Sequence, residues 1–320
     1  SVRCVRDDSE LIPVSSVTLD KTSVTMDVGQ TLAIAATITP SNANHQSAHW
    51  WSEDEGIATV DSEGNITALS GGTVIITAMA GMQIAECIVK VIAVKDYIDE
   101  NNINHGKGIL IGEVVWAPVN CGYHKNNFKY GKLYQWGRKY GQGYNTSYDA
   151  TSPTIVEGPV MPSVGMSENN KNFYYQVTTK PYDWCVMQVD DWWDCSTENN
   201  STANPCPAGW RVPTYAELSV LRQNYSQWTT NEGGQYGYFF VGEYTYMDNI
   251  SQVFFPAAGY RYNTGISYAD ERDDTGCYWS SEPSYKYAYA DNLEFDSNLL
   301  SMTNMLRSYG CSVRCVQIIN

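Results

Sequence analysis

Apolar and polar residues alternate along most of the first 94 positions, and this two-residue period is the strongest constraint on the fold. Apolar side chains recur at every second position from Leu32 to Ile38, which predicts a strand with one buried face. Shorter runs at 17–19 and 24–26 follow the same rule. Turn-forming residues interrupt the segment at intervals of roughly 8–12 residues, the spacing of a β-sandwich, for example at 27–29, 63–65 and 71–72. We therefore expect an all-β sandwich over residues 13–94.

Four motifs in this segment resemble the bacterial immunoglobulin-like domain of group 2. They are Trp51-Ser52, Ile57 to Asp61, Gly64 to Ala68 and Gly71 to Ala78. The resemblance implies a spacer or presentation module of surface proteins. The alternation places apolar side chains in the sandwich core, and a cysteine in a strand behaves as a small buried hydrophobe. The expected core residues are Val60, Ile66, Val74, Ile76 and Cys87.

Aromatic residues are distributed unevenly along the chain. Of 24 Tyr, 10 Trp and 7 Phe, only Trp50, Trp51 and Tyr97 precede residue 107. Two segments with such different composition indicate two domains with different functions. The polar, Asn-rich stretch 95–106 predicts a linker between them. In the second domain, residues 107–320, long loops separate short strands, and such loops indicate binding.

One helix and several strands are predicted in the second domain. Thr214 and Glu217 have the spacing of a capping box, which predicts a helix that buries Leu218 and Leu221 on one face. Short apolar runs predict strands at 114–116, 252–255, 277–279, 293–295 and 312–316.

Six ordered motifs of this domain resemble the Fibrobacter succinogenes major paralogous domain. They lie at 116–120, 134–138, 204–214, 256–261, 278–281 and 312–316. The resemblance implies an α+β fold of the C-type-lectin type, related to formylglycine-generating enzymes. The expected fold class is therefore multidomain, an all-β immunoglobulin-like sandwich followed by an α+β C-type-lectin-like domain. We interpret the Gly, Pro, Trp and Arg residues of the motifs as scaffold, including Trp116, Trp136, Trp210 and Trp279.

The two ends of the chain nearly repeat each other. Ser1 to Val5 is identical to Ser312 to Val316. We interpret residues 1–12 as an N-terminal strand or the remnant of a preceding domain. The alternative is a strand that pairs with a sheet edge, within the molecule or in a neighbour.

Charge and hydropathy limit the partners. The chain has 20 Lys+Arg and 35 Asp+Glu, a net charge of −15, which argues against nucleic acid and anionic membrane surfaces. No run reaches the roughly 20 apolar residues of a membrane span, and no leader opens the chain. We expect an exported protein, tethered to the outer surface through N-terminal sequence that is missing here.

The cysteines and acidic residues assign no metal site. Nine cysteines leave at least one unpaired within the chain. Cys185 and Cys195 could pair with each other, or either could pair with Cys206. Calcium, the usual lectin cofactor, takes oxygen ligands, but the acidic clusters at 190–194 and 270–274 fit solvated loops better. We expect no cofactor, and calcium stays unassigned.

Catalytic motifs are absent from the sequence. None of the four His lies in a triad or metal motif, and the phosphate-binding glycine patterns are missing. The related formylglycine-generating enzymes use a cysteine pair near the C-terminus, so an oxidase with Cys311 and Cys315 and copper is the alternative. We expect a non-enzymatic protein.

A binding surface is therefore the favoured function. Tyr gives large, rigid contact area and Asn gives adaptable hydrogen bonding, the mixture that paratopes use. If the chain is extended, alternation places Tyr285, Tyr287 and Tyr289 on one face; the competing interpretation is that such rings pack the core. The stretch 278–315 also resembles the variable region of proteins diversified by retroelements. The candidate ligand-binding residues are Trp192, Trp193, Tyr262, Tyr268, Tyr285, Tyr287, Tyr289, Asn292, Asn298 and Asn304.

These observations predict a cell-surface adhesin or ligand-binding protein. The immunoglobulin-like domain would act as a spacer, and the lectin-like domain would bind an extracellular protein or glycan. A structural pilus or surface subunit is the second alternative, beside the oxidase.

Overall fold

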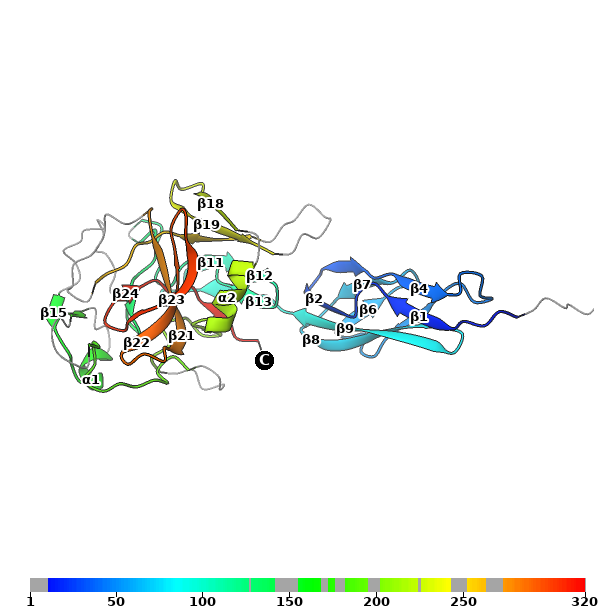
Figure 1. Ribbon diagram of the computed structural model, residues 1–320, viewed down its shortest axis with the longest axis horizontal. Helices are drawn as coiled ribbons and strands as arrows, with labels where there is room; N and C mark the ends of the chain where they lie inside the picture. The colour runs from blue at the N-terminus through cyan, green and yellow to red at the C-terminus, as the bar shows by residue number, and fades with distance from the viewer. Residues whose placement is uncertain are drawn as a thin grey trace, which may run out of the picture. The chain divides into compact units, whose positions relative to one another are not determined.

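The computed structural model describes residues 11–126, 128–141, 155–167, 172–175, 182–194, 202–223, 226–242, 252–262 and 273–319. The chain divides into two compact units, Ser1–Val94 (unit 1) and Lys95–Asn320 (unit 2) (Figure 1). In the described part of the chain, no helix has the length and apolar character needed to cross a membrane. The N-terminal repeat at residues 1–6 lies outside the described residues.

Unit 1 is built from strands alone within residues 11–94. One sheet has the strand order β2-β9-β8-β5, a second has the order β3-β7-β6, and β1 pairs with β4. The strands are β1 (Ser16–Leu19), β2 (Ser23–Asp27), β3 (Thr31–Ala33), β4 (Ala36–Thr39), β5 (His49–Ser52), β6 (Ala58–Val60), β7 (Asn65–Ala68), β8 (Gly72–Ala80) and β9 (Gln83–Ile92).

Period-two alternation creates the core of unit 1. Val74 and Ile76 of β8 are buried, and Ile66 of β7 packs in the same cluster. Cys87 is fully buried in β9, as predicted, while Val60 is half-buried at the edge of the cluster. These side chains face one another because successive residues of a strand point to opposite faces of its sheet.

The predicted strand over 32–39 is instead two strands. β3 pairs with β7, whereas β4 pairs with β1, so the chain changes partner between them. At the break, the Ala35 N–H donates to the Asp20 carboxylate at 2.7 Å and the Ile34 N–H donates to the Gly64 carbonyl at 3.0 Å. Alternation detects the buried face but not a change of partner along it.

Unit 2 is mostly β-structure in its described part, with two short helices, α1 (Pro162–Gly165) and α2 (Tyr215–Gln223). Its strands are β10 (Asp96–Ile98), β11 (Asn104–Lys107), β12 (Ile109–Ile111), β13 (Val114–Trp116), β14 (Tyr134–Gln135), β15 (Ile155–Glu157), β16 (Phe173–Tyr175), β17 (Trp210–Arg211), β18 (Ser226–Thr230), β19 (Tyr236–Val241), β20 (Gln252–Pro256), β21 (Gly276–Pro283), β22 (Tyr289–Phe295), β23 (Leu300–Leu306), β24 (Gly310–Cys311) and β25 (Val316–Gln317).

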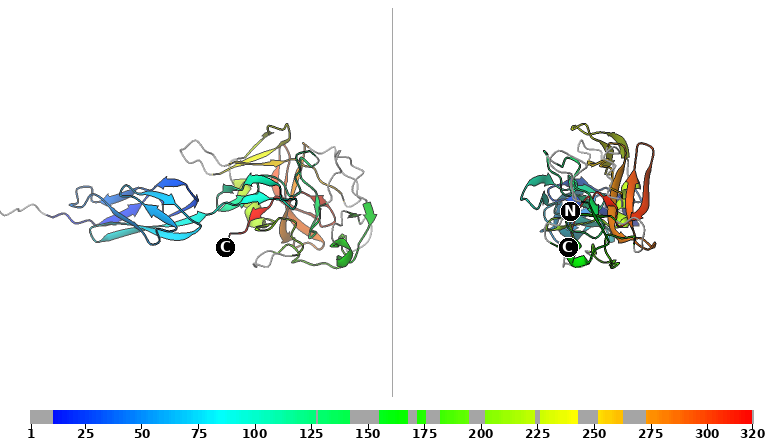
Figure 2. Two further views of the ribbon diagram at one scale, coloured as in Figure 1. Left: turned by 180° about the vertical axis from the view of Figure 1, so that it is seen from behind. Right: turned by 90° about the vertical axis from the view of Figure 1, so that its left-hand side faces the viewer.

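The first and last parts of unit 2 meet in one sheet. Its order is β12-β13-β25-β17, and Trp116 of β13 pairs with Val316 of β25. Figure 2 shows the red C-terminal strand beside β13. Two further sheets, β18-β19-β20 and β21-β22-β23, contribute aromatic side chains to the core. The N-terminal and C-terminal parts of unit 2 are thus joined by backbone hydrogen bonds.

Helix α2 begins as the capping box predicts. The Thr214 N–H donates to a Glu217 carboxylate oxygen at 2.8 Å, and the Glu217 N–H donates to the Thr214 hydroxyl at 3.2 Å. Leu218 and Leu221 are fully buried. The capping box and the buried face of this helix are confirmed.

The stretch expected as a linker forms part of unit 2. Strands β10 and β11 make an antiparallel hairpin. Tyr97 in β10 is buried; its ring packs edge-on against Trp210 at 5.1 Å, and its hydroxyl lies 3.6 Å from the Cys315 sulfur. The polar composition of residues 95–106 predicted a linker. The segment packs on unit 2 through the buried Tyr97, whereas Ile98 and Ile103 are exposed.

Candidate functional site

The tip of the β21–β22 hairpin carries the most exposed aromatic side chains among the described residues. Residues 284–288 connect the two strands, and within them Tyr285 is 90% and Tyr287 57% exposed. Ser284 and Ala288, on either side, are buried. The chain turns here, so the expected extended alternation of Tyr285, Tyr287 and Tyr289 is wrong for the first two. Both rings are nevertheless exposed, because the turn leaves them outside the sheet.

Three of the candidate residues converge on Lys286. Its ammonium donates to the Asn304 side-chain oxygen at 3.1 Å. It also lies 5.8 Å from the ring centre of Tyr285 and 5.6 Å from that of Tyr289, within the range of a cation–π contact. We call the group Tyr285, Lys286, Tyr287, Tyr289 and Asn304 the tip surface. Sequence reasoning missed Lys286, although it lies between two of the predicted tyrosines.

Arg307 holds the base of this surface. It is 1% exposed, and its Nε donates to the Tyr289 carbonyl at 3.1 Å while its backbone N–H donates to the Ala288 carbonyl at 2.9 Å. Its guanidinium lies 4.4 Å from the ring centre of Trp136 and pairs with Asp190. One buried cation thus links the tip surface to the acidic loop that contains Asp190.

The two tryptophans of that loop pack against other tryptophans. Trp193 is fully buried, its indole donates to the Ala203 carbonyl at 3.0 Å, and its ring lies 5.6 Å from Trp136. Trp192 is partly buried and packs 4.8 Å from Trp184. The prediction that Trp193 is exposed for ligand is wrong, because the pair anchors an otherwise polar loop to the core.

The remaining candidates are scattered. Asn292 is fully buried in β22, so it is unsuited to contact a ligand. Tyr262 packs against Tyr309 with ring centres 5.0 Å apart. Asn298 is exposed at the β22–β23 turn, where its N–H donates to Asp296 at 2.6 Å. Tyr268 lies outside the described residues.

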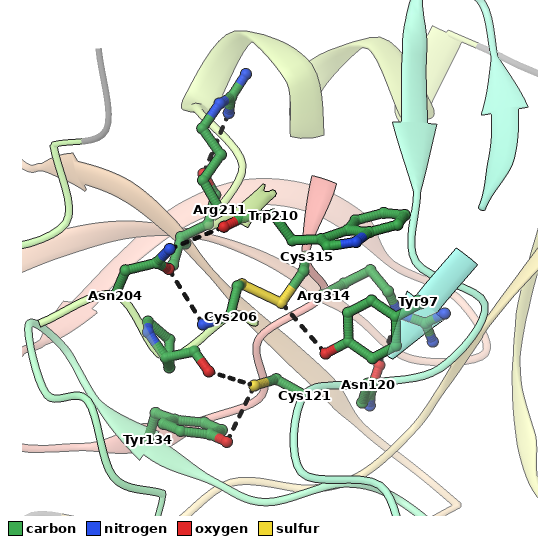
Figure 3. The surroundings of a disulfide bond; sticks show 12 residues. Tyr97, Asn120, Cys121, Tyr134, Asn204, Cys206, Trp210, Arg211, Arg314 and Cys315 are labelled. Carbon is green, nitrogen blue, oxygen red and sulfur yellow. Dashed lines mark hydrogen bonds between the residues drawn. A yellow bond between two sulfur atoms is a disulfide. The ribbon is translucent and has the colours of Figure 1, made fainter. Parts of the chain in front are cut away.

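The disulfides differ from the pairings considered from the sequence. Cys206 bonds to Cys315, and Cys277 bonds to Cys311 (Figure 3 shows the first). Cys185 is a free, buried thiol, and Cys195 lies outside the described residues. Cys206 and Cys315 are 109 residues apart in sequence, and the pairing of β17 with β25 brings them together. The spacing of cysteines along the sequence does not predict this bond.

These bonds also contradict the oxidase alternative. That alternative requires Cys311 and Cys315 to act together, but each is bonded to a different cysteine, and both are fully buried. Sequence reasoning placed Cys315 in a core strand over 312–316. Cys315 is buried as expected, but it lies between β24 and β25 and not in a strand.

A cavity of about 820 Å³ lies beside the Cys206–Cys315 bond. Its walls include Cys121, Tyr134 and Lys132. The Cys121 sulfur accepts a hydrogen bond from the Tyr134 hydroxyl at 3.1 Å and donates to the Pro205 carbonyl at 3.1 Å (Figure 3). Burial raises the pKa of Cys121 to about 11, so the thiol is protonated at neutral pH and is a poor nucleophile.

Among the described residues, no three His, Cys, Asp or Glu side chains are grouped so that they could hold a metal ion. The acidic residues from Asp190 to Asp194 belong to this described set, whereas 270–272 do not.

Two families match parts of the chain. Residues 13–89 match the bacterial Ig-like domain (group 2), which confirms the resemblance of the N-terminal segment. Residues 188–316 match a domain of unknown function, DUF8237. An Ig-like domain is therefore established at the N-terminus.

Two curated proteins match over short stretches. An uncharacterised protein of Clostridium acetobutylicum is 40% identical over 72 residues, 22% of this chain and 7% of that protein. A 3-O-alpha-D-galactosyl-alpha-L-arabinofuranosidase of Bifidobacterium longum subsp. longum is 36% identical over 80 residues, 23% of this chain and 7% of that enzyme. The chain thus spans only a small part of either relative.

Solved structures match at low similarity. Domains 4 and 5 of the S-layer protein SbsC are 21% identical with a TM-score of 0.23, over 25% of this chain and 53% of that chain. An intimin mutant of EHEC O157:H7 is 21% identical with a TM-score of 0.22, over 27% and 54%.

Proposed function

We propose that this chain is an exported cell-surface protein that binds an extracellular protein through the tip surface of unit 2. The Ig-like domain serves as the spacer, and unit 2 has a lectin-like fold. The observation that carries the proposal is that the Tyr285 side chain is 90% exposed, although the flanking residues Ser284 and Ala288 are buried. Large exposed aromatics on a supported turn are typical of interfaces.

The tip surface is organised before a ligand arrives. The Ser284 N–H donates to the Tyr289 carbonyl at 3.1 Å, and the Tyr289 N–H donates to the Lys286 carbonyl at 3.1 Å. Lys286 is held by Asn304, and the strand below is held by Arg307. Because these groups are already ordered, binding costs less conformational entropy.

Of the two ligand classes, the tip surface favours protein. A ring that is 90% exposed stands clear of its surroundings and fits into a pocket of the partner, whereas small ligands occupy concave sites. Tyr is among the residue types that dominate protein interfaces. The tip also lies within the stretch that resembles the variable region of retroelement-diversified proteins. As part of the proposal, Tyr285 and Tyr287 vary naturally between related strains.

The test is the double variant Tyr285→Ala/Tyr287→Ala, in the full chain, on arrays of extracellular proteins and glycans. Loss of both hot-spot side chains should weaken capture of a protein ligand by about thirtyfold or more. Tyr215→Ala, which removes a ring that is 39% exposed elsewhere in unit 2, is the matched control and should bind normally.

Protein capture that is unchanged in the double variant would contradict the proposal. Tip-dependent capture of glycans in place of proteins would correct the ligand class. Equal far-ultraviolet circular dichroism of both variants and the parent chain verifies that the comparison concerns binding alone.

A further inference from the structure

Three segments of unit 2 that contain none of the tip-surface residues line a groove of about 500 Å³. The β18–β19 hairpin contributes aromatic rings, and the segment before β21 and the β22–β23 turn contribute carboxylates and an amide. The side chains that define the groove are Trp228, Tyr236, Asp273, Asp274, Asp296 and Asn298. This volume is in the range of small-ligand sites.

The aromatic wall is a pair of rings. Trp228 and Tyr236 are nearly parallel, with an interplanar angle of 24° and ring centres 6.2 Å apart. Trp228 packs edge-on against Phe295 at 6.4 Å, so its position is set by the core. Tyr236 remains 46% exposed. The wall therefore combines an anchored ring with an accessible one.

Asp273 forms a second wall beside Tyr236 and is held firmly. Its Oδ1 accepts from the Tyr130 hydroxyl at 2.7 Å and from the Tyr236 N–H at 2.9 Å, and its own N–H donates to the Ala257 carbonyl at 2.8 Å. Its φ of 68° lies in the left-handed region, which Asp tolerates better than most residues. Both hydrogen bonds to the carboxylate use Oδ1, which fixes the side chain at the groove.

The third wall is a tight turn. Asp296 Oδ1 accepts from the Asn298 N–H at 2.6 Å and from the Leu299 N–H at 2.8 Å, and the Asp296 N–H donates to the Leu299 carbonyl at 2.9 Å. This network fixes the backbone that carries the Asn298 side chain. Asp274 is exposed at the groove.

We infer that this groove binds an uncharged saccharide unit. A pyranose has an apolar face of C–H groups and a rim of hydroxyls, which match an aromatic ring and a set of carboxylate and amide groups. The carboxylates repel sialylated and sulfated sugars.

The inference is independent of the tip surface, and its test keeps the two apart. The probes are free neutral gluco-, galacto- and manno-oligosaccharides, the same sugars on an array, and sialylated and sulfated counterparts. Titration of the full chain should detect binding to at least one neutral probe and to none of the acidic ones. Comparing binding to the free sugars with binding to the arrayed glycans shows whether the ligand is a soluble sugar or the terminus of a larger glycan.

Two groove variants and their controls locate the binding. Tyr236→Ala keeps the backbone bond to Asp273, and Asp274→Ala changes an exposed side chain, so both should fold. Each should weaken binding by about tenfold or more, because a charged hydrogen-bond partner or a stacking ring is lost. Tyr215→Ala and Asp191→Ala, matched in type and also exposed, should leave it unchanged.

Binding to no neutral probe would overturn the inference, as would neutral-sugar binding that both groove variants retain. If Tyr285→Ala/Tyr287→Ala abolishes sugar binding and the groove variants retain it, the sugar-binding site is the tip surface and not the groove. Conversely, sugar binding that survives the tip substitutions, with no protein captured, would support the groove and contradict the proposed function alone.

Discussion

Buried charged side chains organise unit 2 at the scale of single residues. Arg138, Arg261, Arg307 and Arg314 are each at most 1% exposed. Arg314 donates to Asn120 and to the carbonyls of Ala117 and Phe254, and its guanidinium lies 4.5 Å from the ring centre of Phe255. Such bonds replace water around a buried cation and join loops that have little apolar surface of their own.

Asp183 is a buried side chain that is not fully hydrogen-bonded, because among the described residues one of its carboxylate oxygens has no partner. Burial raises its pKa to about 7 from an ordinary value of 3.8, and Arg307 opposes the rise. Between pH 4 and 7 the folded chain therefore binds more protons here than the unfolded chain. The free energy of unfolding should decrease as the pH rises through this interval.

Asp183→Asn should remove this dependence. We expect the variant to match the parent chain near pH 4 and to be more stable at pH 8, in urea unfolding followed by Trp fluorescence. Eight of the ten Trp lie after residue 106, so fluorescence reports on unit 2. Asp191→Asn, an exposed neighbour, is the control. Parallel stability profiles for the parent chain and Asp183→Asn would contradict the prediction.

At the scale of elements, helix α2 depends on its first turn. Arg211 forms a bidentate pair with Glu217 at 2.6 and 2.7 Å, in addition to the capping box. Burial alone would raise the pKa of Glu217, but the hydrogen bonds and charge of Arg211 and the hydrogen bonds of Thr214 together outweigh burial and lower it below 4.5. Its contribution to stability is therefore complete above pH 4.5 and is lost as the pH falls through the lowered pKa.

Thr214→Ala should destabilise unit 2 by about 1 kcal/mol, because the Glu217 N–H loses its hydroxyl acceptor at the N-terminus of the helix. Urea unfolding at pH 7 measures this difference. Gln223→Ala, at the exposed end of the same helix, should change the stability by less than about 0.5 kcal/mol. Equal effects of both substitutions would show that the capping box contributes nothing.

At the scale of the whole molecule, the two units are stabilised differently. Residues 11–94 contain one cysteine, Cys87, and it is unbonded; their core is a sandwich of apolar side chains. The described part of unit 2 has two disulfides, whose cysteines are 109 and 34 residues apart in sequence. Long closed loops restrict the unfolded chain, which is worth roughly 3–5 kcal/mol for each bond.

A reductant should therefore affect one unit only. In differential scanning calorimetry we expect two transitions, because the chain has two separate cores. With dithiothreitol the transition of unit 2 should move to lower temperature, while that of unit 1 stays in place. The double variant Cys206→Ala/Cys315→Ala should lower the same transition without reductant. A common shift of both transitions would contradict independent units.

Local pattern determined much of this protein without its tertiary structure. Alternation identified the sandwich and its buried Ile66, Val74, Ile76 and Cys87, and the spacing of Thr214 and Glu217 located a helix start. These features depend on neighbours a few residues apart, since strand and helix periods are local properties of the chain. The scaffold role of Trp116, Trp136, Trp210 and Trp279 is confirmed in the same way, because all four are buried.

Only the tertiary structure decided which aromatic and polar residues reach the surface. Trp193 and Asn292 have the same composition signal as Tyr285 and Asn298, yet the first two are buried and the last two are exposed. The partners of Cys206 and the contacts of Lys286 and Arg307 join strands and loops far apart in sequence. Burial and pairing at such distances depend on how the whole chain packs, which no short window of sequence contains.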